Sequence, residues 1–476
     1  MPHMLADPAL ALDETHVGPL SEDLLRRFDT PGPRYTSYPT ADRLTQAFGP
    51  EDATAALARL SVSGAVPTEP LSVYVHIPFC ESLCYYCGCN KVISKHHERA
   101  GEYLDLLEAE MRMVAERLGR HRAVSQLHFG GGSPTFLSDE ELTRLVASLQ
   151  DSFALTSDVE MSIEVDPRTV TPARLAALRS LGFNRLSFGV QDFDADVQQA
   201  VHRIQSYESV HLLMTAAREL GFRSINADLI YGLPKQTPSS FARTLEQTCE
   251  LKPDRIALYA YAHLPTVFKP QRRILAEDLP DPAQRTQMLS SAIEAFLSAG
   301  YEYIGMDHFA RSDDSLAVAK REGRLQRNFQ GYSTHKDCDL IGLGASSISR
   351  VGSTYYQNAK TLPDYYAAIR CDRLPVIRGV SLTDDDLLRR SVIMELMCQG
   401  QLDFDAVRDA FGIDARSYFE NELERLSSFA TFGLVELDGK GVSVTAKGWY
   451  LIRAIAMVFD AYLPAKTQPG RFSRVV

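Results

Sequence analysis

The sequence contains no long hydrophobic run. No stretch of about 18 or more apolar residues occurs, so no transmembrane helix is predicted. The first residues also lack a charged start followed by an apolar core and a small-residue cleavage site, so we expect no secretory signal. Internal repeats and low-complexity tracts are absent too, which argues against a repeat architecture. These absences predict a globular chain acting in the cytoplasm.

An excess of positive charge is also missing. Lysine and arginine total 50 against 61 aspartate and glutamate, which gives a formal net charge of −11. A generally acidic surface argues against sequence-independent binding to nucleic acid or to an anionic membrane. We therefore expect neither as a partner, although a local basic pocket stays open. The 476 residues allow about three domains at roughly 150 residues each.

Cysteine is unevenly placed. Four of the eight cysteines fall within residues 80–89 (CESLCYYCGC), and the others are scattered singly. Scattered cysteines are usually inert core residues. One tight cluster in a cytosolic chain points to metal or redox chemistry rather than to disulfides.

The chain divides by pattern into three predicted domains: 1–54, 55–375 and 376–476. The first is read as an irregular arm, because residues 31–40 (PGPRYTSYPT) hold three prolines and a glycine. The second alternates short apolar strands with amphipathic helices. Strands are predicted at 71–77, 126–129, 160–165, 185–190, 224–230 and 255–261, with helices at 98–118, 138–153, 172–181, 207–220 and 238–250.

Each helical spacer is long enough to cross over between parallel strands. Six such units in series predict an α/β fold, with a parallel sheet that is either open or curved into a partial (β/α)6 barrel. In either case the active site is expected at the carboxyl ends of the strands. The third domain is predicted to be mostly helical, at 384–397, 404–410, 417–429 and 447–462. A small hairpin is expected at 434–437 and 442–445, as in a winged-helix module.

The cysteine cluster directly follows the first predicted strand. Four thiolates suit a zinc site or a 4Fe–4S site. Structural zinc sites usually join two separated pairs, whereas these cysteines share one loop. Such a loop can wrap three corners of a cube through Cys80, Cys84 and Cys87. Cys89 follows too closely to reach the fourth corner, which leaves one iron open.

Polar and glycine residues follow the next strands. Residues 130–135 (GGGSPT) end the second strand and let backbone approach a ligand closely. Carboxylates and amides at successive strand ends are expected to converge on one site, where they can accept hydrogen bonds from a cofactor. They are Glu164, Asp166, Gln191, Asp192, Asn226 and Asp228. Arg203 suits bidentate binding of a carboxylate. From the residues alone, the prediction ends at an iron–sulfur enzyme with a glycine-lined cofactor site.

The spacing C-x-x-x-C-x-aromatic-C, with Tyr86 at the aromatic position, resembles the radical S-adenosylmethionine superfamily. This resemblance implies a 4Fe–4S cluster on Cys80, Cys84 and Cys87, with S-adenosylmethionine chelating the fourth iron. It also implies that the glycine run contacts the amino group of that cofactor.

Longer runs resemble one family within it, the oxygen-independent coproporphyrinogen III oxidases. They are 74–80 (YVHIPFC), 184–193 (NRLSFGVQDF), 228–234 (DLIYGLP), 305–310 (GMDHFA), the arm, and 471–475 (RFSRV). The resemblance implies oxidative decarboxylation of two propionates of coproporphyrinogen III to vinyl groups, giving protoporphyrinogen IX in haem biosynthesis. It implies a 5′-deoxyadenosyl radical, a monomer, and an electron donor such as flavodoxin or ferredoxin.

The resemblance further implies two bound S-adenosylmethionine molecules. Contacts of the first are Tyr74, Gly131 and Glu164; contacts of the second are Tyr86, Gly132, Ser133, Gln191, Arg203, Asp228, Ala262 and Ile348. Tyr74 and Cys89 are implied as catalytic. Because the substrate carries four carboxylates and the chain is acidic, we expect local cations such as Arg34 of the arm to bind it.

Three other functions compete. The related haem chaperone typically lacks the cysteine at position 89 and the Arg-Tyr-Thr-Ser-Tyr-Pro arm, and both are present in this sequence. A DNA-binding regulator would need a basic recognition helix, but 417–429 (SYFENELERLSSF) carries three glutamates and one arginine. Another radical enzyme, such as a methyltransferase, would differ in its products.

Overall fold

The computed structural model describes residues 24, 27–28, 30–62, 70–119, 121–335 and 338–463. The chain forms two compact units: Tyr35–Arg390, and Met1–Arg34 together with Ser391–Val476. These limits differ from the sequence boundaries at 54/55 and 375/376, and the three-domain division stays a prediction. The run 471–475 lies outside the described residues.

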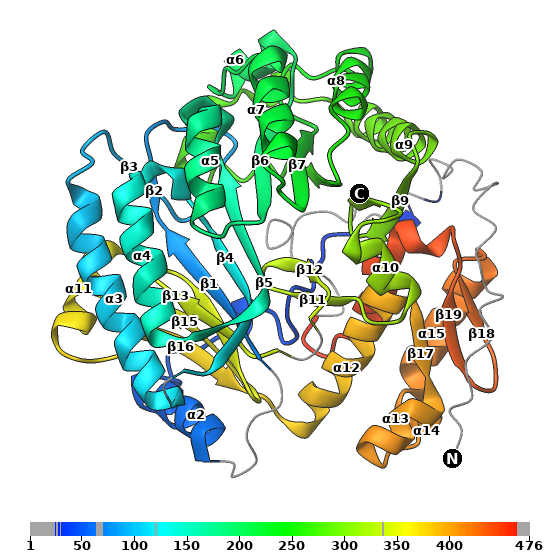
Figure 1. Ribbon diagram of the computed structural model, residues 1–476. Coiled ribbons are helices and arrows are strands. Elements are labelled where there is room, and N and C mark those ends of the chain that lie inside the picture. The colour runs from blue at the N-terminus through cyan, green and yellow to red at the C-terminus, as the bar shows by residue number, and fades with distance from the viewer. Residues whose placement is uncertain are drawn as a thin grey trace. The chain divides into compact units, whose positions relative to one another are not determined.

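The larger unit is built on one sheet, shown in Figure 1. Six strands that follow one another along the chain are neighbours in the sheet and run parallel. Their bounds agree with the six predicted strands to within a few residues, except that β5 begins six residues earlier than predicted. They are β1 (Leu71–Ile77), β4 (Ala123–Gly131), β5 (Ala154–Val165), β6 (Arg185–Gln191), β7 (Ser224–Tyr231) and β8 (Arg255–Ala260). The predicted partial (β/α)6 barrel is confirmed.

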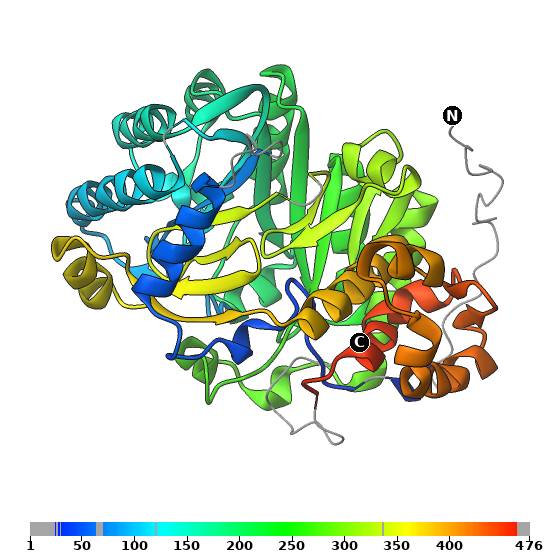
Figure 2. The same ribbon diagram turned by 90° about the horizontal axis from the view of Figure 1, so that it is seen from below.

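Helices cover one side of these strands (Figures 1 and 2). Local sequence fixes where they begin: Ser138 and Glu141 form a capping box at α4, and Thr237 caps α8 ahead of Pro238. The crossover helices are α3 (Arg99–Leu118), α4 (Asp139–Ser152), α5 (Pro172–Ser180), α6 (Ala195–Ala200), α7 (Tyr207–Glu219) and α8 (Pro238–Leu251). All but the short α6 were predicted.

Along each parallel strand, apolar and polar side chains alternate. In β6, Leu186, Phe188 and Val190 are buried. The alternate residues of the strand, such as Ser187 and Gln191, are half-buried and line cavities. Parallel strands that are covered on both faces are usually apolar throughout, whereas these strands alternate between apolar and polar residues. The apolar core therefore lies between strands and helices, while the other face of the strands is polar.

The sheet extends beyond the predicted strands at both edges. Its order is β16-β15-β14-β13-β1-β4-β5-β6-β7-β8-β10-β9. Beyond β8 lie β10 (His308–Arg311) and β9 (Tyr301–Gly305), both antiparallel. β13 (Leu340–Leu343) runs parallel to β1, and an antiparallel meander follows it. That meander comprises β14 (Ile348–Val351), β15 (Thr354–Asn358) and β16 (Val376–Ser381).

Shorter elements complete the larger unit. They are α2 (Pro50–Val62), β2 (Phe79–Cys80), β3 (Val92–Ile93), α9 (Pro282–Ser298), α10 (Ser315–Arg321), β11 (Gln326–Asn328), β12 (Gly331–Ser333) and α11 (Leu362–Arg370). Because α2 starts at Pro50, the expectation of an irregular arm through residue 54 was wrong at its end. Glu51 and Asp52 in the first turn of α2 favour a helix start there.

The smaller unit is helical with a small antiparallel sheet, as predicted. α12 (Asp384–Gln399) crosses the unit boundary, and a third strand joins the predicted hairpin. The other elements are β17 (Gln401–Asp403), α13 (Phe404–Phe411), α14 (Ala415–Tyr418), α15 (Glu420–Thr431), β18 (Val435–Leu437) and β19 (Gly441–Val444).

The single helix expected at 447–462 was wrong. The chain forms three short pieces, η7 (Gly448–Leu451), α16 (Ile452–Ala456) and η8 (Met457–Phe459). Leu451 leaves the helical region, with φ −114° and ψ 17°. Buried Arg453 donates to the Pro33 carbonyl at 2.9 Å and to that of Gly32. These contacts outweigh the local preference for one continuous helix.

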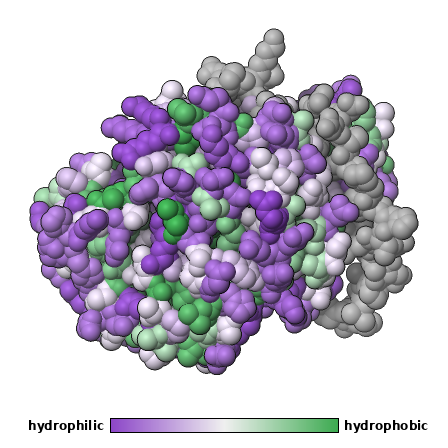
Figure 3. Space-filling view, turned by 90° about the horizontal axis from the view of Figure 1, so that it is seen from above, coloured by the Kyte–Doolittle hydropathy of each residue, from purple (hydrophilic) through white to green (hydrophobic). Residues whose placement is uncertain are grey.

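The face shown in Figure 3 is mainly hydrophilic, and hydrophobic residues reach it in separate patches. Among the described residues, no helix combines the length and apolar character needed to cross a membrane.

Candidate active site

A cavity of about 340 Å³ opens at the carboxyl ends of the parallel strands. Except for Tyr74, Ala262 and Ile348, every predicted cofactor, cluster or catalytic residue lines it. Those lining residues are Cys80, Cys84, Tyr86, Cys87, Cys89, Gly131, Gly132, Ser133, Glu164, Gln191, Arg203 and Asp228. The cysteine loop and the strand-end polar groups therefore face one space.

A small pair of strands closes the cysteine loop. β2 and β3 run parallel, with Phe79 opposite Val92 and Cys80 opposite Ile93. The Val92 N–H donates to the Pro78 carbonyl at 2.7 Å, and the Ser94 N–H donates to that of Cys80 at 3.0 Å. The two ends of the loop are thereby tied together, so residues 81–91 form a compact turn beside the cavity.

The thiols in this loop have different electrostatic surroundings. A hydrogen bond from Cys89 lowers the pKa of the Cys87 thiol to about 5, while burial raises the pKa of Cys80 to about 12. Arg203 Nη1 lies 3.5 Å from the Cys84 sulfur and Arg168 Nη2 lies 3.6 Å from it. Cations and hydrogen bonds stabilise thiolate, which is the form that binds metal.

Within the described residues, no three or more His, Cys, Asp or Glu side chains already stand in the arrangement of a metal site. The ligand set Cys80, Cys84 and Cys87 therefore stays a prediction. This prediction rests on the spacing of the three cysteines, on their position in one loop and on the cavity that all three line.

The glycine run at the end of β4 is required by close packing. Gly131 has φ +111°, and a Cβ there would lie 2.4 Å from the His76 ring. A Cβ on Gly132 would lie 2.7 Å from the Phe79 carbonyl oxygen. The Gly131 N–H donates to Glu164 Oε2 at 3.2 Å, which orients that carboxylate at the cavity wall. Only glycine fits this cradle.

Two polar atoms in the cavity have no hydrogen-bond partner among the described residues: Gln191 Oε1 and Arg203 Nε. The amide oxygen needs a donor and the guanidinium needs an acceptor. Gln191 also has φ +67°, at a bulge in β6. S-adenosylmethionine carries an amine and hydroxyls that donate and a carboxylate that accepts, so it fits these residues.

An arginine pair surrounds Asp166 next to this cavity. Arg168 Nη2 donates to Asp166 Oδ2 at 2.6 Å, and Arg203 Nη2 lies 3.3 Å from Oδ1. Burial alone would raise the pKa of Asp166, but the hydrogen bond from Arg168 and the charge of Arg203 hold it below its usual range. Asp166 therefore serves to fix both guanidinium groups near Cys84.

The three predicted residues outside the cavity lining have defined places. Tyr74 on β1 bonds His76 Nδ1 at 3.1 Å, and its ring stacks on His128 with centroids 5.8 Å apart. The Ala262 carbonyl accepts from Gln271 Nε2 at 3.1 Å, and the same amide donates to the Tyr86 carbonyl at 2.9 Å. Ile348 begins β14.

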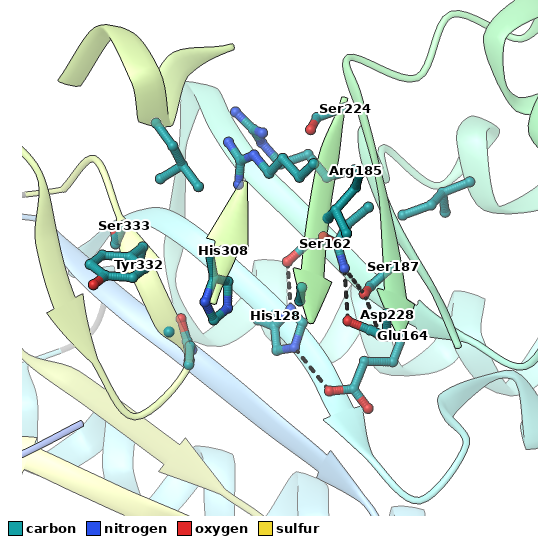
Figure 4. A pocket seen from close by; sticks show the side chains of 18 of the residues that line it. His128, Ser162, Glu164, Arg185, Ser187, Ser224, Asp228, His308, Tyr332 and Ser333 are labelled. Carbon is teal, nitrogen blue, oxygen red and sulfur yellow. Dashed lines mark hydrogen bonds and ion pairs between the residues drawn. The ribbon is translucent and has the colours of Figure 1, made fainter. Parts of the chain in front are cut away.

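A second cavity, of about 190 Å³, shares Glu164, Ser187, Asp228 and Tyr259 with the first (Figure 4). His128 joins two neighbouring side chains in it. Its Nδ1 lies 2.6 Å from Ser162 Oγ and its Nε2 lies 3.5 Å from Glu164 Oε1. Burial raises the pKa of Asp228 to about 6, so this carboxyl takes up a proton at a higher pH than an ordinary aspartate does.

Not all strand-end polar groups converge as expected. Asp192 turns away from the cavity, accepting from Gln236 Nε2 at 2.6 Å and Thr244 Oγ1 at 3.1 Å. It follows Gln191 directly, and neighbouring strand residues point to opposite faces. Asn226 lines only the second cavity, where it donates to Asp228 Oδ1 at 2.9 Å.

The sequence interpretation missed many of the lining residues, among them Lys91, His128, Arg168 and Tyr259. Two had a local signal. Arg168 follows Asp166 by two residues at a strand end, and Lys91 follows the cysteine loop. His128 and Tyr259 occupy polar-face positions of β4 and β8, which only the strand register reveals.

Two family models match the chain. The model of the radical SAM superfamily matches residues 74–248, and that of the HemN C-terminal domain matches residues 382–451. The first covers the cysteine loop and the cradle, and the second covers residues 391–451 of the smaller unit.

Curated relatives match nearly the whole chain. An oxygen-independent coproporphyrinogen III oxidase of Pseudomonas aeruginosa is 50% identical over 95% of this chain and 98% of its own length. That of Escherichia coli K12 is 49% identical over the same shares. The chain belongs to the oxygen-independent coproporphyrinogen III oxidase family.

A solved structure agrees with this assignment. The coproporphyrinogen III oxidase HemN from Escherichia coli, described as a radical SAM enzyme, matches with a TM-score of 0.87 at 49% identity, over 90% of this chain and 98% of its own. The resemblance predicted from the motifs is confirmed. The haem-chaperone alternative is not favoured, because these relatives are named oxidases.

Proposed function

We propose that the chain catalyses oxygen-independent oxidative decarboxylation of two propionate side chains of coproporphyrinogen III to vinyl groups, giving protoporphyrinogen IX in haem biosynthesis. The observation that carries this proposal is the 50% identity to oxidases of that name over 95% of the chain. The cavity that joins the cysteine loop to the glycine cradle supports it.

Radical SAM membership implies a 4Fe–4S cluster and S-adenosylmethionine. In this proposal Cys80, Cys84 and Cys87 hold the cluster. When bound and reduced, the two cofactors would supply a 5′-deoxyadenosyl radical for removal of hydrogen from the propionate, and the substrate radical would then release carbon dioxide and pass one electron to an external acceptor to leave the vinyl group. The protein contributes binding, orientation and electrostatics.

The cavity residues divide that work. The bare backbone of Gly131 and Gly132 permits close approach of the cofactor, and Glu164, held by the Gly131 N–H, accepts from an amine. Arg203 Nε is free among the described residues to donate to a carboxylate. Asp166 keeps the Arg203 guanidinium in place, so the carboxylate binds in one orientation.

Two S-adenosylmethionine molecules are part of the proposal. Tyr74, Gly131 and Glu164 would contact the first. Contacts of the second would be Tyr86, Gly132, Ser133, Gln191, Arg203, Asp228, Ala262 and Ile348. A second cavity adjoins the first and shares Glu164 and Asp228 with it, which offers room for a second molecule, although Gly131 lines the first cavity together with most contacts of the second molecule. Equilibrium dialysis of the reconstituted protein should give two molecules per chain; a single site would refute the division.

Cys89 and Tyr74 are proposed as catalytic. Cys89 lines the cavity one residue beyond Gly88, with its N–H 3.5 Å from the Cys87 sulfur. Tyr74 faces His76 and His128 at the strand that leads into the loop.

The deciding experiment is anaerobic incubation of reconstituted, dithionite-reduced protein with S-adenosylmethionine and coproporphyrinogen III. Mass spectrometry should find protoporphyrinogen IX and 5′-deoxyadenosine. Cofactor cleavage with an unchanged porphyrinogen, across the substrate concentrations tested, would refute the assigned substrate. Haem binding without decarboxylation would favour the chaperone.

We also propose that the chain works as a cytoplasmic monomer that receives electrons from flavodoxin or ferredoxin. A cytoplasmic location suits the cysteine loop, which an oxidising compartment would cross-link. Light scattering of the purified protein tests the monomer: a mass near the 53.0 kDa of one chain is expected.

A further inference from the structure

A surface lies on the outer side of the cysteine loop. Tyr85 and Tyr86 are adjacent, but only Tyr86 lines the cavity. The Tyr85 ring stacks on that of exposed His202, with centroids 5.1 Å apart and planes 8° from parallel. The Arg273 guanidinium lies over the same tyrosine ring, 5.0 Å from its centroid, and donates to its hydroxyl at 3.0 Å.

Two segments remote in sequence are fixed to this side of the loop. The Tyr85 N–H donates to the Val201 carbonyl at 3.0 Å, and Gln271 Nε2 donates to that of Tyr86 at 2.9 Å. Beneath them, Val201 and Ile274 belong to one buried cluster, and both tyrosines pack against it. Residues 201–204 and 267–275 therefore form a continuous cover over the loop.

This cover exposes an unusual combination of side chains, which we name the basic patch. Its apolar members are among the most exposed large hydrophobic residues of the described chain: Ile204 at 71%, Val267 at 61% and Leu275 at 55%. Its cations, all exposed, are Lys269, Arg272 and Arg273. Acids lie close by in sequence: Glu277 is exposed, and Asp278 is paired with Lys235 at 2.5 Å.

The patch places three exposed cations within five residues on a chain whose net charge is −11. Exposed apolar side chains beside such charges are typical of a transient interface. The patch does not line the cavity, so its position suits a partner that approaches the cluster from outside rather than a substrate that must enter.

We propose that the basic patch is the docking surface for a small acidic flavoprotein that donates one electron from its flavin. The inference rests on the proposed function, which requires a reduced cluster. In the docked complex the donor loses one electron and the oxidised cluster gains it; no bond forms and no proton moves. Tyr85, next to Cys84, brings the patch within one residue of a predicted cluster ligand.

Charge reversal tests the docking. In reconstituted holoenzyme, K269E/R272E/R273E should weaken binding of oxidised flavodoxin by at least about tenfold in calorimetry, and added salt should weaken binding to the unaltered protein. Flavodoxin-driven formation of 5′-deoxyadenosine should fall, while dithionite-driven turnover stays within about twofold. The single variant K269E should show a smaller loss in the same direction.

R59E/R112E/R223E is the matched control, because it reverses three exposed cations on α2, on α3 and directly before β7. Iron content and the visible spectrum verify that every variant keeps its cluster. The proposal is overturned if the patch variants bind flavodoxin as tightly as the control. It is also overturned if they instead raise the KM for coproporphyrinogen III under dithionite, which would make the patch a substrate site. Unaltered protein that stays inactive with dithionite would refute the proposed function, and the binding measurement would still decide the docking.

Discussion

Cys89 differs from the three cysteines before it in its place on the loop. The loop ends are tied by β2 and β3, and Cys89 lies two residues beyond Cys87, to whose sulfur its own N–H points at 3.5 Å. The geometry suits a residue that supports a ligand and reaches the cavity rather than one that binds the fourth iron.

We therefore expect Cys89→Ser to keep the cluster, and Cys80→Ser, Cys84→Ser and Cys87→Ser each to lose it. Anaerobically purified protein should contain about four iron and four sulfide per chain, with a brown absorption that fades in air. Iron and sulfide analysis of the four variants checks this. A cluster retained in Cys84→Ser but lost in Cys89→Ser would show the ligand set to be wrong.

Gly131 gives a second test at this scale. Gly131→Ala should weaken S-adenosylmethionine binding by at least about tenfold, because the new Cβ meets the His76 ring and the backbone sits at a φ that alanine adopts only with strain. Gly101→Ala in α3, where a Cβ meets nothing within 4 Å, should leave binding unchanged. Equal affinities in both variants, measured by equilibrium dialysis, would count against the cradle.

At the scale of elements, Glu110 joins α3 to the sheet extension. Its buried carboxylate accepts from the Gly344 N–H at 2.7 Å, from Tyr365 Oη at 2.6 Å and from Asn358 Nδ2 at 2.5 Å. Gly344 follows β13, Asn358 ends β15 and Tyr365 lies in α11. Burial raises the pKa of Glu110 to about 7, above its ordinary 4.5, although the hydrogen bonds oppose the rise.

Because the folded state holds this proton more tightly than the unfolded state, stability contributed by Glu110 is present below about pH 4.5 and is lost as pH rises through about 7. Glu110→Gln does not lose this stability as pH rises, because its amide does not titrate. Its free energy of unfolding, relative to the unaltered protein, should rise between pH 5 and pH 8 by on the order of 3 kcal/mol.

In Glu110→Gln the new amide faces Asn358, which shifts the free energy of unfolding by an amount that does not depend on pH. This constant shift leaves the change of the difference with pH unaltered. Denaturant unfolding of anaerobic protein at several pH values measures it. Glu116→Gln, at an exposed position of the same helix, should show no such trend. A flat difference for Glu110→Gln would contradict the assigned cause.

The elements differ in how far sequence could predict them. The parallel strands and their helices were predictable because strand alternation and helix caps are local signals, as at Ser138 and Thr237. The meander β14–β16 was missed because it depends on pairing: β13 joins β1, more than 250 residues earlier in the chain. A strand of the composition Leu-Ile-Gly-Leu carries too little local signal by itself.

The site divides in the same way. The cysteine loop and the glycine run were predictable from spacing, since one short segment supplies each. His128 and Tyr259 were not, because their place in the cavities depends on the register of neighbouring strands. Asp192 was wrongly expected in the cavity because all polar residues at a strand end were expected to face the same way. Side chains of successive strand residues point to opposite faces, so Asp192, which follows Gln191, points toward the helices.

At the scale of the whole molecule, charge constrains how substrate is captured. A chain of net charge −11 does not attract a tetracarboxylate over long range, so short-range cations must bind it. Arg34 stays our candidate. Its neighbours Gly32 and Pro33 are bonded by Arg453 within the smaller unit, so this part of the arm has a fixed conformation.

Arg34→Ala should raise the KM for coproporphyrinogen III about tenfold or more, since loss of a charge-assisted hydrogen bond costs about 1.5–3 kcal/mol. Cluster content and slow cofactor cleavage without substrate should persist. Steady-state kinetics under dithionite measure both. Deleting residues 1–40 is a weaker test, because it also removes the fully buried Tyr35 and Tyr38. An unchanged KM in Arg34→Ala would end this assignment.

The alternation of the parallel strands has a consequence for how this molecule can vary. On β1, β5 and β6, side chains such as Val73, Ile163 and Phe188 are fully buried, whereas their neighbours Tyr74, Glu164 and Ser187 are polar. Substitutions at the first set should reduce the yield of folded protein and leave the specific activity of what remains unchanged. Substitutions at the second set should do the reverse. A mutational scan that measures protein abundance and turnover separately should therefore find the two effects at alternating residues along each strand.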